Sequence, residues 1–170
     1  MRRRAALAAL AVFGGCATTK RPADALSGKL SVRIDAAGSQ PARSVTSDFE
    51  LRGDAERGEL RLTAPLGTLV AVARWAPGEA VLQSGQGEQR YPDLDTLARE
   101  SLGEALPLRA LPSWLRGQPW PGAASRANDG GFEQLGWQVG LAKFADGLLE
   151  VSRQAPPPAV LLRARLDQPG

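Results

Sequence analysis

The 170-residue sequence contains no histidine. Histidine is the commonest general base and the commonest transition-metal ligand in proteins, so its absence excludes a Ser-His-Asp triad and a Cys-His pair. A single cysteine excludes a cysteine-based metal site, and no Walker-type glycine-rich loop is present. The composition therefore argues against most enzyme classes, and we expect neither a metal nor a cofactor.

Carboxylate pairs are the conventional catalytic groups that remain. Asp93 and Asp95 are close in sequence, and Glu100 and Glu104 are one helical turn apart. Two carboxylates can act as acid and base, as in glycoside cleavage. Acidic residues also favour a helix N-terminus or lie on a solvated helix face. We expect this structural role, and a protein that is not an enzyme.

Long apolar runs are also absent, and the one near the N-terminus is short. Residues 5–15 follow three arginines and are too few to span a bilayer, which takes about 20 residues. A basic start, a short apolar segment and two terminal glycines predict a signal peptide over residues 1–15. Cys16 follows directly, as in the lipobox of bacterial lipoproteins, although Phe13 stands where leucine is usual.

The alternative is an ordinary signal peptide with an incidental cysteine. An unpaired thiol is unusual in an exported protein, so we predict that Cys16 is acylated. Residues 16–25 are small, polar and interrupted by proline, which predicts a lipidated flexible tether. Residues 26–170 are then one domain with its own core.

Without the predicted signal peptide, the chain has no net charge. Three of the 21 basic residues lie at positions 2–4, which leaves 18 basic residues against 18 acidic ones. A neutral chain with interspersed signs has no electrostatic footprint for nucleic acid. We therefore expect no nucleic-acid partner.

The rest of the chain reads mainly as strands. Leu30, Val32 and Ile34 alternate with polar residues, which is the period of a half-buried strand. The same pattern predicts strands near residues 28–34, 45–51, 59–63, 68–75, 80–83, 89–91, 132–141, 148–153 and 160–166. Two short amphipathic helices are predicted near 93–103 and 108–115, and a loop over 118–131. The expected fold is an antiparallel sheet that curls, with helices set against it.

One turn and the few aromatic residues leave alternatives open. Pro65 and Gly67 predict a tight turn with Leu66 at its tip, where the leucine either inserts into lipid or folds back over the sheet edge. Aromatic residues make up 5% of the sequence, and four of them are tryptophans. Trp75, Trp114, Trp120 and Trp137 belong either to the core or to an apolar ligand site.

Several segments occur in a particular order along the chain: the lipobox-like start ending at Cys16, the strand 28–32, the segment 60–67, the run 106–119 with Leu111 and Trp114, the Gly136-Trp137 pair and the strand 160–166. Together they resemble the LolB family of outer-membrane lipoprotein receptors. No single motif is specific, but their order matches over most of the chain.

The resemblance implies a fold that is mainly β with short helices. In it, a half-open, curved antiparallel β-barrel of the LolA/LolB type encloses an apolar cavity and is capped by helices. Acyl chains require such a lining, because each buried methylene contributes about 0.8 kcal/mol. The expected cavity residues are Leu30, Val32, Phe49, Leu51, Leu60, Leu62, Leu97, Leu102, Leu111, Trp114, Leu115, Trp137 and Val139.

The resemblance also implies a function and a location. Such a receptor accepts acylated lipoproteins from a LolA-like periplasmic carrier and inserts them into the outer membrane, and a protruding loop with a leucine passes on the cargo. Here that membrane-transfer loop is Pro65, Leu66 and Gly67. Ala17 after the lipidated cysteine, in place of aspartate, implies outer-membrane residence facing the periplasm. We expect a monomer that contacts carrier, cargo and outer-membrane lipids.

Two other classes of function remain open. One is a structural accessory lipoprotein of an outer-membrane assembly machine. The other is a lipid-anchored hydrolase that uses carboxylates.

Overall fold

The alternating segments form a single antiparallel sheet in the computed structural model, which describes residues 25–102 and 106–167. The order of the strands across the sheet is β6-β5-β4-β3-β2-β1-β11-β10-β9-β8-β7. The strands are β1 (Leu26–Ile34), β2 (Arg43–Gly53), β3 (Gly58–Thr63), β4 (Leu69–Ala76), β5 (Glu79–Ser84), β6 (Gly87–Tyr91), β7 (Ser125–Asn128), β8 (Gly131–Gln134), β9 (Trp137–Gly140), β10 (Leu148–Arg153) and β11 (Val160–Leu166). The helices are α1 (Leu94–Leu102), α2 (Leu111–Trp114) and the 3-10 turn η1 (Phe144–Asp146).

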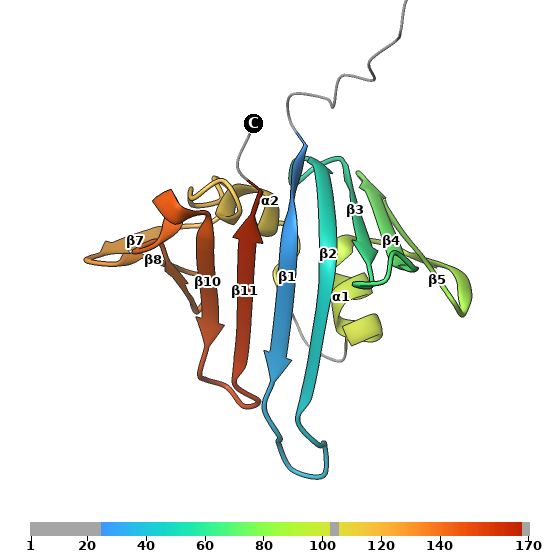
Figure 1. Ribbon diagram of the computed structural model, residues 1–170, viewed down its shortest axis with the longest axis horizontal. Coiled ribbons are helices and arrows are strands. Elements are labelled where there is room, and N and C mark those ends of the chain that lie inside the picture. Colours follow the sequence, from blue (N-terminus) through green and yellow to red (C-terminus); the bar gives the residue numbers. More distant parts are fainter. Residues whose placement is uncertain (1–24, 103–105, 168–170) are drawn as a thin grey trace, which may run out of the picture.

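The sheet is curved and open, with β6 and β7 at its two edges. Figure 1 shows that the sheet is curved and that α1 and α2 lie on its concave side, which they partly cover. Gly28 of β1 pairs with Leu166 of β11, which brings the first and last strands together at the centre of the sheet. The prediction of a mainly antiparallel β fold with short helices is therefore confirmed.

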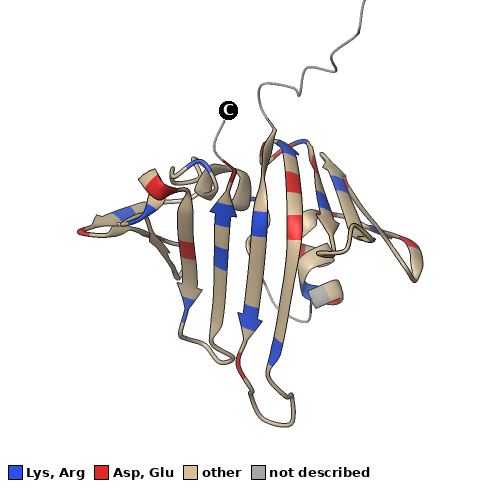
Figure 2. Ribbon diagram, in the orientation of Figure 1, with Lys and Arg blue, Asp and Glu red and all other residues tan. Residues whose placement is uncertain are grey.

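Alternation divides the side chains between two faces. Every second residue of a strand points to the concave side, and most of these residues are apolar. They pack with apolar residues of the helices in one buried cluster. The convex side carries charges, such as the ion pairs Lys29–Asp48 and Arg163–Glu150. Figure 2 shows positions of both charge signs distributed along the central strands. The core thus lies between the sheet and the helices.

Two expectations about residues 118–141 were wrong. The expected loop contains β7, which pairs with β8 across the Asp129-Gly130 turn. The expected strand over 132–141 is two strands, because Leu135 and Gly136 form a turn with φ of 56° and 78°. Leucine rarely takes a positive φ, so the segment reads as continuous strand in the sequence.

No helix within the described residues is long and apolar enough to cross a membrane.

Candidate functional site

The loop between β3 and β4 is a tight turn with an apolar tip. The Gly67 amide donates to the Ala64 carbonyl at 2.8 Å, and the Ala64 amide donates to the Thr68 carbonyl at 2.8 Å. Pro65 supplies the fixed φ of the first turn position, and Gly67 takes the left-handed conformation at φ 85° that closes such a three-residue loop. The turn leaves Leu66 with its surface 97% exposed.

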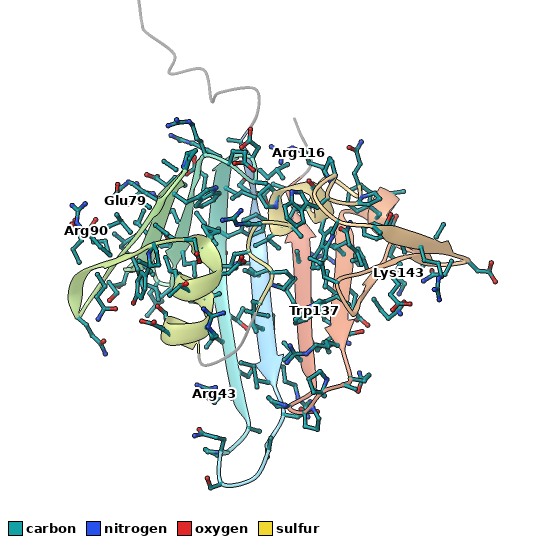
Figure 3. The ribbon with its side chains drawn as sticks, turned by 180° about the vertical axis from the view of Figure 1, so that it is seen from behind. Arg43, Glu79, Arg90, Arg116, Trp137 and Lys143 are labelled. Atoms are coloured by element: carbon teal, nitrogen blue, oxygen red, sulfur yellow. The ribbon has the colours of Figure 1, made fainter. Side chains whose placement is uncertain are left out.

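The concave interior brings the expected cavity residues together. Leu30, Phe49, Leu51, Leu60, Leu97, Leu111, Trp114, Leu115, Trp137 and Val139 are buried in one cluster, and Val32 and Leu62 are partly buried against it. Leu102 ends α1, but its side chain lies outside the described set. Figure 3 looks onto this face, with α1 and α2 in front of the strands and Trp137 labelled among the side chains on this side.

One buried polar side chain, Gln134, joins residues 111–123, which we call the α2 segment, to the sheet. Gln134 of β8 is 1% exposed, and its Oε1 accepts from the Trp114 indole Nε1 and the Trp120 amide, both at 2.8 Å. Its Nε2 donates to the carbonyls of Trp120 and Ala123, again at 2.8 Å. These bonds satisfy the buried amide, so it fixes the position of the segment that covers the interior.

The other side of the α2 segment is held by Arg116. Its guanidinium donates to the Pro112 carbonyl at 2.7 Å and to the Gly53 carbonyl, at the end of β2, at 3.2 Å. The α2 segment therefore bridges β8 and β2 across the open sheet. The roles of Gln134 and Arg116 were not predicted from the sequence. Gln134 could have been noticed, because it lies two residues after Phe132 and therefore on the same inward face of the strand.

Helix α1 is fastened to the edge of the sheet and contacts β5 and β6. The Asp93 carboxylate accepts from the Thr96 amide at 2.7 Å, and this bond holds the pKa of Asp93 below its usual value. The Tyr91 and Ser101 hydroxyls lie 3.1 Å apart and join β6 to the end of α1. Asp93 thus caps the helix, as expected from its position.

The first carboxylate pair, Asp93 and Asp95, has separate partners in the part of the chain described. Asp95 faces Arg109, with Oδ2 and Nε 3.6 Å apart. Glu104 and Cys16 lie outside the described residues. Among residues 25–102 and 106–167, no group of three or more acidic or cysteine side chains is arranged to hold a metal ion.

The fold and site together define a class of β protein: an open, curved antiparallel sheet with an apolar concave side, a helical cover and an exposed leucine at the tip of the β3–β4 turn. The family model described as outer membrane lipoprotein LolB matches residues 25–166. The chain belongs to the LolB family of outer-membrane lipoproteins.

Relatives in several bacteria support this assignment. Outer-membrane lipoprotein LolB of Chromobacterium violaceum is 34% identical over 160 residues, which cover 86% of each chain. The Bordetella petrii protein of the same name is 33% identical over 178 residues, covering 94% of this chain and 88% of the relative. The Bordetella pertussis protein is 34% identical over 181 residues, covering 94% and 89%. The predicted family, function as an outer-membrane lipoprotein receptor, and outer-membrane location are confirmed.

Proposed function

We propose that this protein takes acylated lipoproteins from a LolA-like periplasmic carrier, holds their acyl chains against its concave face and releases them into the outer membrane. The protein acts without catalysis, as a monomer anchored through acylated Cys16 after removal of residues 1–15, with residues 16–25 as a tether. The domain over 26–170 binds the cargo. The observation that carries the proposal is the continuous apolar concave face beneath a helical cover.

The chemistry of acyl chains favours this face as their binding site. A chain of 16 carbons gains on the order of 12 kcal/mol on leaving water, at about 0.8 kcal/mol per methylene. The residues that meet the concave face from α1, from α2 and from the segments flanking α2 are apolar, among them Leu94, Leu97, Leu106, Leu111 and Leu115. These side chains cover the apolar surface against which we expect the acyl chains to bind.

An entry route is supported by the uneven cover. Val32 and Leu62 are only partly buried, whereas Leu51 and Leu115 are fully buried. Helix α1 packs Leu94 and Leu97 on the interior and is otherwise held by contacts with β5 and β6 and by the exposed Asp95–Arg109 pair, whereas α2 is held by the bonds of Gln134 and Arg116. Acyl chains would therefore enter beside Val32 and Leu62 and displace α1 more readily than α2.

Uptake of cargo from a loaded carrier tests the proposal. The Val32→Asp variant places a carboxylate in the interior and should reduce uptake at least tenfold, because a charge there cannot be solvated beside acyl chains. Ser31→Asp is the matched control on the opposite face, where its strand partner is Arg163. Its uptake should equal that of the unaltered protein. Equal uptake by both variants, or no uptake by the folded unaltered protein, would refute the proposal.

A further inference from the structure

The turns of the sheet divide into two sets of different chemistry. Antiparallel strands place alternate turns at opposite ends, so the turns 35–42, 64–68, 85–86, 135–136 and 154–159 share one end, which we call the rim. Asp35 is the single charged residue in these five turns, and they contain no tyrosine, tryptophan or arginine. Figure 2 shows the β1–β2 and β10–β11 turns almost free of charge colouring.

The opposite end, where β1 begins and β11 ends, carries charges in its turns. Asp54, Glu56 and Arg57 lie between β2 and β3, Asp129 lies between β7 and β8, and the β9–β10 connection contains Lys143 and Asp146. The two ends are therefore exposed to the same solvent but have different compositions. Solubility alone does not explain this difference.

Exposed apolar side chains follow the same division. The large apolar side chains that are exposed among the described residues are Val45, Leu66, Leu69, Val70 and Leu135. Leu66 and Leu135 lie in rim turns, Leu69 and Val70 open β4 directly after one, and Val45 is the third residue of β2. Leu66 is on one side of the central strands and Leu135 is on the other.

Leu135 is unfavourable for folding where it stands. It takes φ 56° in a two-residue hairpin turn with Gly136, a conformation that suits asparagine or glycine and strains leucine. The residue is 47% exposed and is not among the side chains that pack against the buried cluster. The strained backbone and the partly exposed side chain make Leu135 a candidate for a contact outside the described fold.

We propose that the rim is a bilayer-contacting surface and that Leu135 enters the lipid as a second apolar tip opposite Leu66. This inference rests on the proposed function. A lipid surface excludes charge, which agrees with the composition of the rim, whereas protein partners commonly use arginine and aromatic residues for contact. Prolines also lack the amide donor that is costly to leave unpaired in lipid, and Pro65 and the run 156–158 lie in rim turns.

The length of the preceding chain permits this orientation. From Cys16 to residue 25, an extended chain spans at most about 30 Å. The nine-residue strand β1 covers roughly 27 Å at about 3.3 Å per residue. Although β1 begins at the end opposite the rim, the anchor and the rim can therefore reach the same membrane.

Lipid-borne quenching of single labels tests the orientation. The full chain, processed and acylated in a Gram-negative host and reconstituted into phosphatidylethanolamine and phosphatidylglycerol vesicles, carries a polarity-sensitive fluorophore on Leu135→Cys, Leu66→Cys or Asp129→Cys. Asp129 is the matched control, because its turn joins the neighbouring strand pair at the opposite end. The chain with only its native cysteine controls for labelling of Cys16.

We expect a blue shift and at least twofold stronger quenching by spin-labelled lipid at positions 135 and 66 than at position 129. Equal quenching at 135 and 129 would overturn the inference. So would a blue shift at 135 that appears only when the carrier is added, because the rim would then contact a protein.

A second variant separates this inference from the proposed function. Leu135→Asn suits the positive φ and should fold at least as stably, take up cargo normally and deliver it to vesicles several-fold more slowly. Delivery at the normal rate would refute the role of Leu135 while leaving the receptor function intact. If the unaltered protein takes up no cargo, the proposed function fails, and the quenching result still decides the orientation of the rim.

Discussion

The covered interior and the rim both contain leucines, but the leucines are buried in the interior and exposed at the rim. In the interior, leucines and tryptophans are buried between the sheet and the helices, with Gln134 satisfying the polar atoms around Trp114. At the rim, Leu66 is almost fully exposed and Leu135 is about half exposed, and neither is among the side chains that pack against the buried cluster. We therefore expect stability to depend on the interior, and exchange with the membrane to depend on side chains that folding does not need.

The largest expected effect is on stability, from the interior. Trp114→Ala should lower the free energy of unfolding by about 3–5 kcal/mol, because it removes a large buried side chain and leaves the Gln134 amide short of a partner. Urea unfolding followed by circular dichroism measures this loss. Trp114→Phe keeps most of the volume and should lose about 1–3 kcal/mol. A loss below 1 kcal/mol for the alanine variant would contradict the role given to the α2 segment.

Alanine substitution at two glycines, one in the sheet and one at the rim, compares how much each region contributes to stability. A Cβ on Gly28 would lie 2.0 Å from the Arg165 carbonyl oxygen, whereas a Cβ on Gly67 would meet nothing within 4 Å. Gly28→Ala should therefore cost about 1–3 kcal/mol from overpacking in addition to its backbone strain. Gly67→Ala should cost about 1 kcal/mol from the positive φ alone. Equal losses in thermal unfolding would contradict the distinction.

Acid should weaken the end opposite the rim. Amides of Arg57 and Glu56 hold the pKa of Asp54 below its ordinary 3.8, and the Thr96 amide does the same for Asp93. A carboxyl with a lowered folded-state pKa stabilises the fold above its unfolded pKa, and this contribution is lost as the pH falls through the folded value. Unfolding midpoints should thus decline below about pH 4. The Asp54→Asn, Asp93→Asn double variant should show a smaller decline than the unaltered protein, and an equal decline would contradict this origin.

The sequence predicted the interior better than the turns. Alternation at Leu30, Phe49 and Leu60 identified the buried face, because a half-buried strand repeats every two residues. The helix near 94–102 was predicted from its cap at Asp93 and its spacing of leucines. These features are local, so they can be read without knowing the partners of each strand.

What the sequence did not predict depends on distant contacts or on unusual local geometry. The role of Gln134 requires Trp114 and Trp120 to approach from another segment. The turn at Leu135 was missed because leucine there contradicts the usual turn chemistry. The exposure of Leu66 was an open alternative from the residues alone, since Pro65 and Gly67 predict a turn but not which way its tip points.

Uptake and delivery measured separately for Leu66→Glu test the central claim most directly. The variant should unfold within about 0.5 kcal/mol of the unaltered protein, because its side chain is exposed. It should accept cargo from the loaded carrier at the normal rate, while delivery into vesicles falls at least tenfold, because a carboxylate does not enter lipid readily. Loss of uptake together with delivery, or delivery at the normal rate, would contradict the separation of a stable interior from a rim that serves the membrane.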